Sequence, residues 1–86
     1  MTPPRVLTLL GSPGCHLCHD MKAVVETVAP ALGFELCERD VRERAEWREY
    51  RLEIPVLLAQ GREVARHRVD ANELERRLRA LAAGSS

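Results

Sequence analysis

Residues 5–18 decide the fold of this chain, and they read Arg-Val-Leu-Thr-Leu-Leu-Gly-Ser-Pro-Gly-Cys-His-Leu-Cys. The first part, through Leu10, is a short and nearly continuous apolar run, which is typical of a strand buried on both faces. Gly11-Ser12-Pro13-Gly14 ends this run as a loop. Two cysteines separated by two residues open the next element. The sequence therefore predicts a close cysteine pair directly after a buried strand.

A helix follows this loop, because apolar side chains recur at helical spacing from about Cys15 to Ala29. The spaced residues are Leu17, Met21, Val24, Val25, Val28 and Leu32. Phe34–Arg39 is predicted to be a second strand. A strand, a helix and a strand in this order require parallel pairing and a right-handed crossover.

A charged segment and a hairpin come next. Val41–Arg51 contains only Trp47 and Tyr50 as large apolar residues, and we expect an exposed helix that lies on the sheet. Val56–Ala59 and Glu63–His67 flank a short turn, which predicts a β-hairpin.

The last helix begins after Asp70, which is a good capping residue, and Glu73 completes a capping-box pattern. One face of this helix is lined by Leu74, Leu78 and Leu81. Residues 83–86 are expected to form a frayed tail. The element order is then βαβαββα in a single domain over residues 1–86, an α/β sandwich with a mixed four-stranded sheet.

The composition narrows the classes of function. Thirteen basic residues balance 13 acidic ones and only three residues are aromatic, so we expect no nucleic-acid partner. The apolar run Val6–Leu10 is too short to span a membrane, and we expect neither a membrane partner nor a signal peptide. Three cysteines are not the disulfide framework of a small secreted domain. We therefore expect a cytoplasmic monomer.

Cys15 and Cys18 are the predicted catalytic residues. Their spacing at a helix start brings the two sulfurs within disulfide reach. The unpaired N–H groups and the dipole at a helix start stabilise an anion, which favours the Cys15 thiolate. Pro13 fixes the preceding turn, and Gly14 is expected to allow close approach of the backbone. We predict that Cys15 forms a mixed disulfide with a substrate and that Cys18 resolves it.

The pattern Gly-x-Pro-Gly-Cys-x-x-Cys at 11–18, followed by Met-Lys at 21–22, resembles the small glutaredoxin-like proteins of bacteria. The resemblance spans Val6 to Leu81 and implies a thioredoxin-like three-layer sandwich with dithiol–disulfide oxidoreductase activity. Ile54-Pro55 stands where this fold family carries a cis-proline, which implies that Ile54 presents its backbone to an extended substrate. The implied partners are protein or small-molecule disulfides, with a reductase or glutathione as electron donor. No tightly bound cofactor is implied.

Several further residues are candidates for binding or tuning. The candidate substrate contacts are Pro13, Gly14, His16, Leu17, Ile54 and Pro55. A protonated His16 would stabilise the Cys15 thiolate, and an exposed polar filler is the alternative. Leu17 faces either a substrate or the core. Asp70 is a candidate contact for the amino group of glutathione as a co-substrate, although its capping role explains it without a ligand. Ser12 replaces a basic residue that glutathione-using relatives usually carry.

Other functions use the same cysteine pair. Cys15-x-x-Cys18-His19 satisfies the c-type haem attachment motif, which normally requires export. The two thiolates with His16 or His19 would leave a closed zinc site one ligand short. An iron–sulfur cluster shared between two subunits, or a redox sensor without turnover, remains an alternative. Cys37 is interpreted as a buried small hydrophobe, with glutathionylation or an intermolecular disulfide as the alternative.

Overall fold

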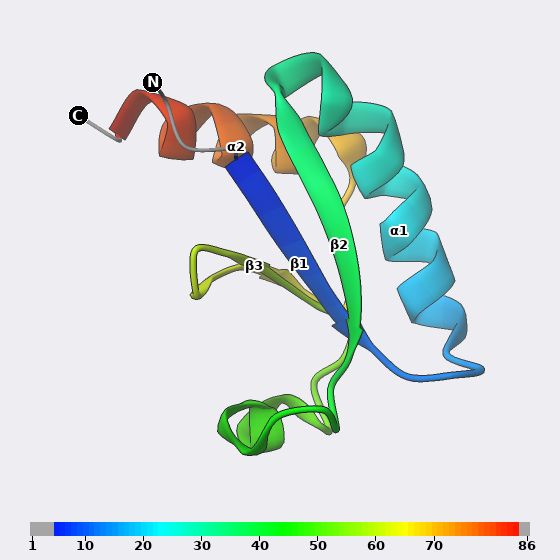
Figure 1. Cartoon of the computed structure of the whole chain (residues 1–86). Coiled ribbons are helices and arrows are strands. Elements are labelled where there is room, and N and C mark those ends of the chain that lie inside the picture. The colour runs from blue at the N-terminus through cyan, green and yellow to red at the C-terminus, as the bar shows by residue number, and fades with distance from the viewer. Residues whose placement is uncertain (1–4, 85–86) are drawn as a thin grey trace.

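The structure, a computed structural model, describes residues 5–84 and the side chains of residues 5–82. Its elements are β1 (Arg5–Gly11), α1 (His16–Val28), η1 (Pro30–Leu32), β2 (Phe34–Asp40), η2 (Ala45–Tyr50), β3 (Val56–Ala59), β4 (Arg62–Arg66) and α2 (Ala71–Gly84). The sheet has the order β2-β1-β3-β4, in which β1 and β2 are parallel and the other pairs antiparallel. The predicted mixed four-stranded sheet in a thioredoxin-like sandwich is confirmed (Figure 1).

Both α-helices cover one face of the sheet. Leu7 and Leu9 of β1 point to this face, because alternate residues of a strand share a face. They form the main core with Met21, Val25, Val28, Phe34, Leu57, Ala59, Leu74 and Leu78. Burying each large apolar side chain contributes about 1.5–3 kcal/mol relative to leaving it exposed. The helical spacing in the sequence thus identified the faces on which α1 and α2 pack.

The layer on the opposite face is thin, because η2 is a six-residue 3₁₀ helix where a longer helix was expected over Val41–Arg51. Trp47 and Tyr50 are three residues apart, which matches the three residues per turn of a 3₁₀ helix. Both pack on a second core, formed by Leu10, Val41, Val56 and Leu58. These two anchors reach the sheet from a single short turn, so no longer helix is needed to bury them.

The chain turns directly after β2, and η2 begins at Ala45, beyond this turn, whereas the predicted helix began at Val41. The Arg42 N–H donates to the Asp40 carboxylate at 2.8 Å, and the Glu43 N–H donates to the Asp40 carbonyl at 3.0 Å. These two bonds form a turn directly after the strand, and residues 41–43 belong to this turn and not to a helix.

The hairpin turn has two residues, Gln60 and Gly61, with φ of 52° and 80°. A two-residue turn with both φ values positive matches the right-handed twist of its strands. His67 was predicted to end the second strand, but β4 ends at Arg66. His67 has a φ of 64°, which is incompatible with an extended strand.

Asp70 caps α2, as predicted, because its carboxylate accepts the Glu73 N–H at 2.7 Å. The reciprocal half of the capping box is absent from the described contacts, because the Glu73 carboxylate instead binds Arg76 and Arg77. The helix extends to Gly84, so residues 83 and 84 are helical rather than frayed, and residues 85 and 86 lie outside the described chain. Among the described residues, no helix has the length and apolar character needed to cross a membrane.

Candidate redox site

The loop before the cysteines is a tight turn. The Cys15 N–H donates to the Ser12 carbonyl at 3.3 Å, with Pro13 and Gly14 between them and a φ of 79° at Gly14. Proline followed by a residue of positive φ is the signature of a type II turn. A Cβ placed on Gly14 would meet no atom within 4 Å. Within the described residues no part of the chain packs closely against Gly14, and its positive φ is what requires glycine.

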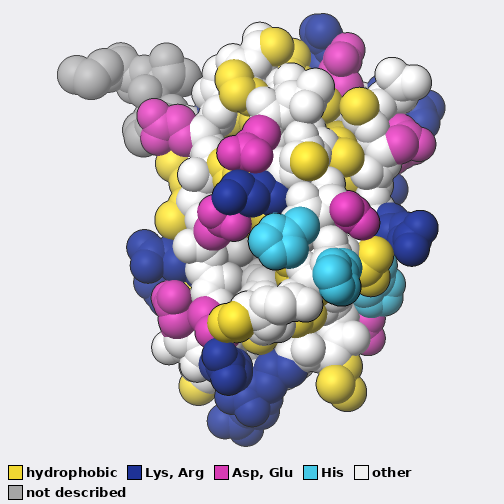
Figure 2. All heavy atoms as spheres, turned by 90° about the vertical axis from the view of Figure 1, so that its right-hand side faces the viewer, with side chains coloured by type: hydrophobic (Ala, Val, Ile, Leu, Met, Phe, Trp, Pro, Cys, Tyr) yellow, Lys and Arg dark blue, Asp and Glu magenta, His cyan; other side chains and the backbone are white. Residues whose placement is uncertain are grey.

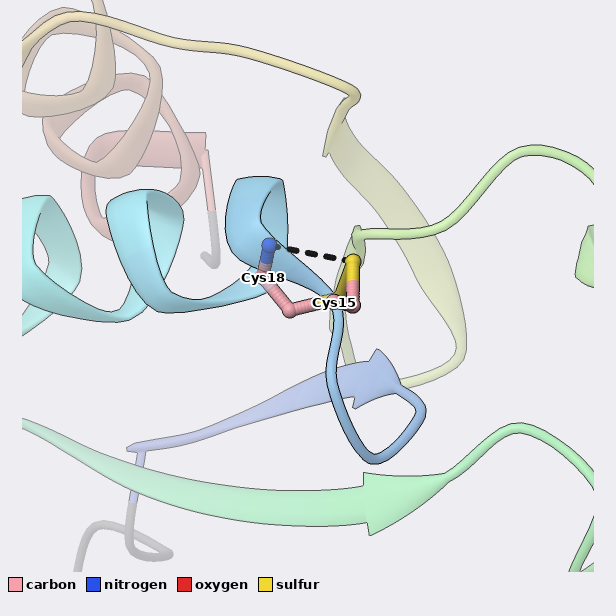
Figure 3. The surroundings of a disulfide bond; sticks show 2 residues. All are labelled: Cys15 and Cys18. Atoms are coloured by element: carbon pink, nitrogen blue, oxygen red, sulfur yellow. Dashed lines mark hydrogen bonds between the residues drawn. A yellow bond between two sulfur atoms is a disulfide. The ribbon is translucent and has the colours of Figure 1, made fainter.

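Cys15 and Cys18 form a disulfide at the start of α1, with their Cα atoms 5.2 Å apart (Figure 3). Cys15 is the N-cap of the helix, and its sulfur accepts the Cys18 N–H at 3.2 Å. Both cysteines are half-buried. The predicted sulfur proximity is confirmed. The amide that would stabilise an anion at Cys15 is directed at its sulfur.

Gly11 makes room for the second sulfur, and sequence reasoning missed this. A Cβ on Gly11 would lie 2.9 Å from Cys18 Sγ and 3.3 Å from Cys18 Cβ, closer than such atoms normally approach. The Val41 N–H donates to the Gly11 carbonyl at 2.9 Å, which fixes the end of β1 against the end of β2. The only signal in the sequence was a glycine at the end of a buried strand, which was assigned to the loop.

The cysteines open onto a shallow cavity of about 430 Å³, here called the disulfide cavity. Besides Cys15 and Cys18, it is lined by Leu9, Gly11, Ser12, Pro13, Gly14, His19, Glu38, Arg39 and Asp40. The charged end of β2 thus forms one wall. The sequence did not indicate this wall, because it depends on the parallel pairing of two strands.

The Asp40 carboxylate in that wall is held by an arginine. Arg42 donates to it through two side-chain nitrogens, at 3.1 and 2.8 Å, and through its backbone N–H. The side-chain bonds, followed by the backbone bond, lower the pKa of Asp40 from 3.8 to about 2. Asp40 is therefore a carboxylate at neutral pH.

The Ile54–Pro55 peptide bond is cis, as the sequence resemblance implied. Pro55 is fully buried, and its carbonyl accepts the His67 N–H at 2.8 Å. Ile54 is half-buried, and within residues 5–84 its backbone N–H and carbonyl have no hydrogen-bond partner. A second cavity, of about 360 Å³ and here called the Arg51 pocket, is lined by Ser12, Pro13, Val41, Arg42, Arg51 and Ile54. The structure thus brings Ile54 to the same loop that carries the cysteines.

The remaining predicted contact residues, His16, Leu17 and Asp70, line neither the disulfide cavity nor the Arg51 pocket. His16 is the first residue of α1 and is exposed, whereas Leu17 is half-buried and belongs to neither core cluster of the described residues. A contact between Asp70 and glutathione stays a prediction.

Cys37 is a free cysteine on the face of the sheet opposite α1 and α2. It pairs with Thr8 of β1 and is half-buried rather than buried. It lines a hollow of about 410 Å³ together with Trp47 and Tyr50. Within the described part of the chain, no three or more His, Cys, Asp and Glu residues gather as a metal site.

Two comparisons with known proteins identify the family and the fold of this chain. Residues 6–79 match the family described as Glutaredoxin-like domain (DUF836). The solution NMR structure of Protein Ne2328 from Nitrosomonas europaea is similar, with a TM-score of 0.65 and 28% sequence identity. The match covers 86% of this chain and 91% of that one. A glutaredoxin-like domain with a disulfide-bonded Cys-x-x-Cys pair fits a redox role. The chain belongs to the glutaredoxin-like family.

Proposed function

We propose that this chain is a dithiol–disulfide oxidoreductase that exchanges disulfides with protein or low-molecular-weight thiols. The observation that carries the proposal is the Cys18 N–H that donates to the Cys15 sulfur at 3.2 Å. An amide directed at a sulfur on a helix N-cap stabilises the thiolate, which is the nucleophile in thiol–disulfide exchange.

The reaction runs in two exchange steps. The Cys15 thiolate attacks one sulfur of the substrate disulfide, so that a Cys15–substrate disulfide forms and the other substrate sulfur leaves as a thiolate, which takes up a proton. The Cys18 thiolate then attacks Cys15 Sγ and releases the second substrate thiol. The substrate gains two electrons, and the protein is left with the Cys15–Cys18 disulfide. Two glutathione thiols, or one dithiol of a reductase, return these two electrons.

The assignment of attacking and resolving sulfurs is supported by their surroundings. Cys15 follows the exposed Pro13-Gly14 turn, whereas Cys18 lies one helical turn further along, with its sulfur against Gly11. A substrate that approaches along the turn meets Cys15 first. Cys18 remains within reach of the mixed disulfide, because the two Cα atoms are only 5.2 Å apart.

The segment Ile54-Pro55 is proposed to hold the substrate backbone. Its Ile54 N–H and carbonyl are unpaired within the described residues, so an extended segment can pair with them as an added strand. Ile54 and the turn residues Ser12 and Pro13 line one pocket, which supports a substrate segment that lies beside the cysteine turn. Leu17 offers an apolar contact at the same end, and a protonated His16 would add positive charge next to Cys15.

We place this activity in the cytoplasm, where protein thiols are kept reduced and a close cysteine pair is more often catalytic than structural. The test is equilibration of the purified protein in a series of glutathione redox buffers, followed by alkylation and mass spectrometry. A reversible Cys15–Cys18 disulfide with a defined midpoint is expected. An adduct on Cys15 would favour coupling to glutathione. A pair that stays reduced in oxidising buffers, or that carries the mass of a metal or haem, would refute the proposal.

A further inference from the structure

We propose that the Arg51 pocket selects disulfides carried on extended, acidic polypeptide segments, with Arg51 binding a carboxylate next to the reacting cysteine. This inference rests on the proposed oxidoreductase function and names its substrate class. The pocket adjoins the cysteine turn, because Ser12 and Pro13 line both it and the disulfide cavity. A side chain close to a substrate cysteine at Cys15 would therefore reach it.

The charges that line the Arg51 pocket are all positive. Arg42 and Arg51 line it, and none of its lining residues is acidic. The Arg42 charge is largely neutralised, because its guanidinium binds both oxygens of Asp40. Arg51 has no side-chain ion pair or hydrogen bond within the described residues. Arg51 therefore supplies a cation without a partner at the mouth of the pocket, which favours an anionic ligand group.

The other cations near the pocket either have an acidic partner or do not line the pocket. Acidic side chains pair with most cations around η2, as Arg44 does with Glu46 and Arg39 with Glu43. Arg48 is also exposed and unpaired among the described residues, but it does not line the pocket. Lys and Arg side chains gather at the lower end of the molecule in Figure 2, where η2 lies in Figure 1.

Two further features favour a polypeptide over a small disulfide. Leu52 is 94% exposed and is the only exposed large hydrophobic side chain within residues 5–82. It directly follows Arg51 in the chain and precedes Ile54 by two residues, and the Ile54 backbone is unpaired within the described residues. A strand-like segment that pairs with the Ile54 backbone would run along residues 51–54, whereas a small disulfide has no extended backbone with which to pair.

The test uses three synthetic peptides that differ only at the two positions beside one cysteine, which carry Glu, Gln or Lys. Each cysteine is joined by a disulfide to pyridine-2-thiol, a leaving group without a carboxylate. The reduced protein attacks the peptide sulfur, the peptide becomes disulfide-bonded to Cys15, and pyridine-2-thione is released and measured. We expect the Glu peptide to react about two- to fivefold faster than the Gln peptide, and the Lys peptide to react slowest. The preference should fade as salt is added.

Arg51→Gln should abolish the preference for the Glu peptide over the Gln peptide, and Arg51→Glu should favour the Lys peptide. Arg48→Gln is the matched control and should keep the preference. Equal rates for all three peptides, retention of the preference in Arg51→Gln, or its loss in Arg48→Gln would each overturn the inference while leaving the oxidoreductase function intact. Release no faster than that with Cys15→Ser, for every peptide, would instead refute the proposed function. An equal preference for oxidised glutathione over an uncharged small disulfide would assign the pocket to small thiols.

Discussion

The cysteines of this chain lie in two environments, the start of α1 and a strand of the sheet. The two environments differ in the backbone N–H groups that are available to donate to the sulfur. At the start of α1, Cys15 receives an amide hydrogen bond and has a second sulfur within bonding distance. On the open face of the sheet, Cys37 lies in a cavity of similar size but has no donor to its sulfur within the described residues. A strand uses its amides in the ladder, whereas the first turn of a helix leaves them free. Reactivity is therefore expected where the helix begins.

The largest expected effect is the loss of all exchange on replacing Cys15. Cys15→Ser should reduce disulfide exchange to the rate measured without protein, because the hydroxyl is not a nucleophile at neutral pH. Cys37→Ser is the matched control and should leave the rate unchanged. The measurement is reduction of a small disulfide by each purified variant. Substantial residual exchange in Cys15→Ser that disappears when Cys37 is also replaced would show that Cys37, and not Cys15, is the more reactive cysteine.

Replacing the second sulfur separates the two steps. Cys18→Ser should still attack through Cys15 but should accumulate the mixed disulfide, because the internal resolving thiol is gone. Intact-mass spectrometry under non-reducing conditions should show one substrate adduct per chain, on Cys15 and not on Cys37. Undiminished dithiol turnover in this variant would rule out a resolving role for Cys18.

Crowding the second sulfur should have an intermediate effect. Gly11→Ala places a Cβ 2.9 Å from Cys18 Sγ, and overpacking of this kind costs about 1–3 kcal/mol. We expect a lower free energy of unfolding and slower resolution of the mixed disulfide. Gly14→Ala is the control, because its Cβ meets no atom and only the positive φ is strained. If both variants resolve the mixed disulfide equally fast, the contact between Gly11 and Cys18 has no role in the chemistry.

The smallest expected effect concerns the segment that covers the Cys37 hollow. Because Arg42 lowers the pKa of Asp40 to about 2, this carboxylate stabilises the fold fully above about pH 4. The contribution is lost as the pH falls from 4 towards 2. Trp47 fluorescence, followed during acid titration, should show a transition in this range that Asp40→Asn abolishes, because asparagine has no carboxyl to protonate. Glu49→Gln removes an exposed carboxylate without an ion pair among the described residues, and should leave the transition in place.

The elements whose apolar residues form a continuous run or recur at helical spacing were predictable from the sequence. The apolar run of β1 and the leucines and valines of α1 and α2 specify burial through spacing alone, and the cysteines follow β1 directly. The segment before β3 was predicted wrongly in length, because two apolar anchors among alternating charges do not distinguish a 3₁₀ turn from a longer helix.

The parts of the site that the sequence did not predict depend on how turns of the folded chain bring residues together. Gly11 and Cys18 are seven residues apart, and only the path of the turn brings them together. The Arg51 pocket joins residues from three segments, so no spacing in the sequence identifies it. Asp40 acquires its low pKa from a neighbour two residues away, which requires the turn after β2 to be known.

The segment around Ile54 is held by His67, the residue directly after β4, and not by the helix that carries the cysteines. The His67 N–H binds the Pro55 carbonyl, and His67 Nε2 lies 2.6 Å from Glu53 Oε2. In the proposed function, disulfide exchange and substrate choice are thus assigned to different parts of the polypeptide. We therefore expect residues 51–54 to be the stretch in which substitutions change the preferred substrate while the cysteine pair stays intact.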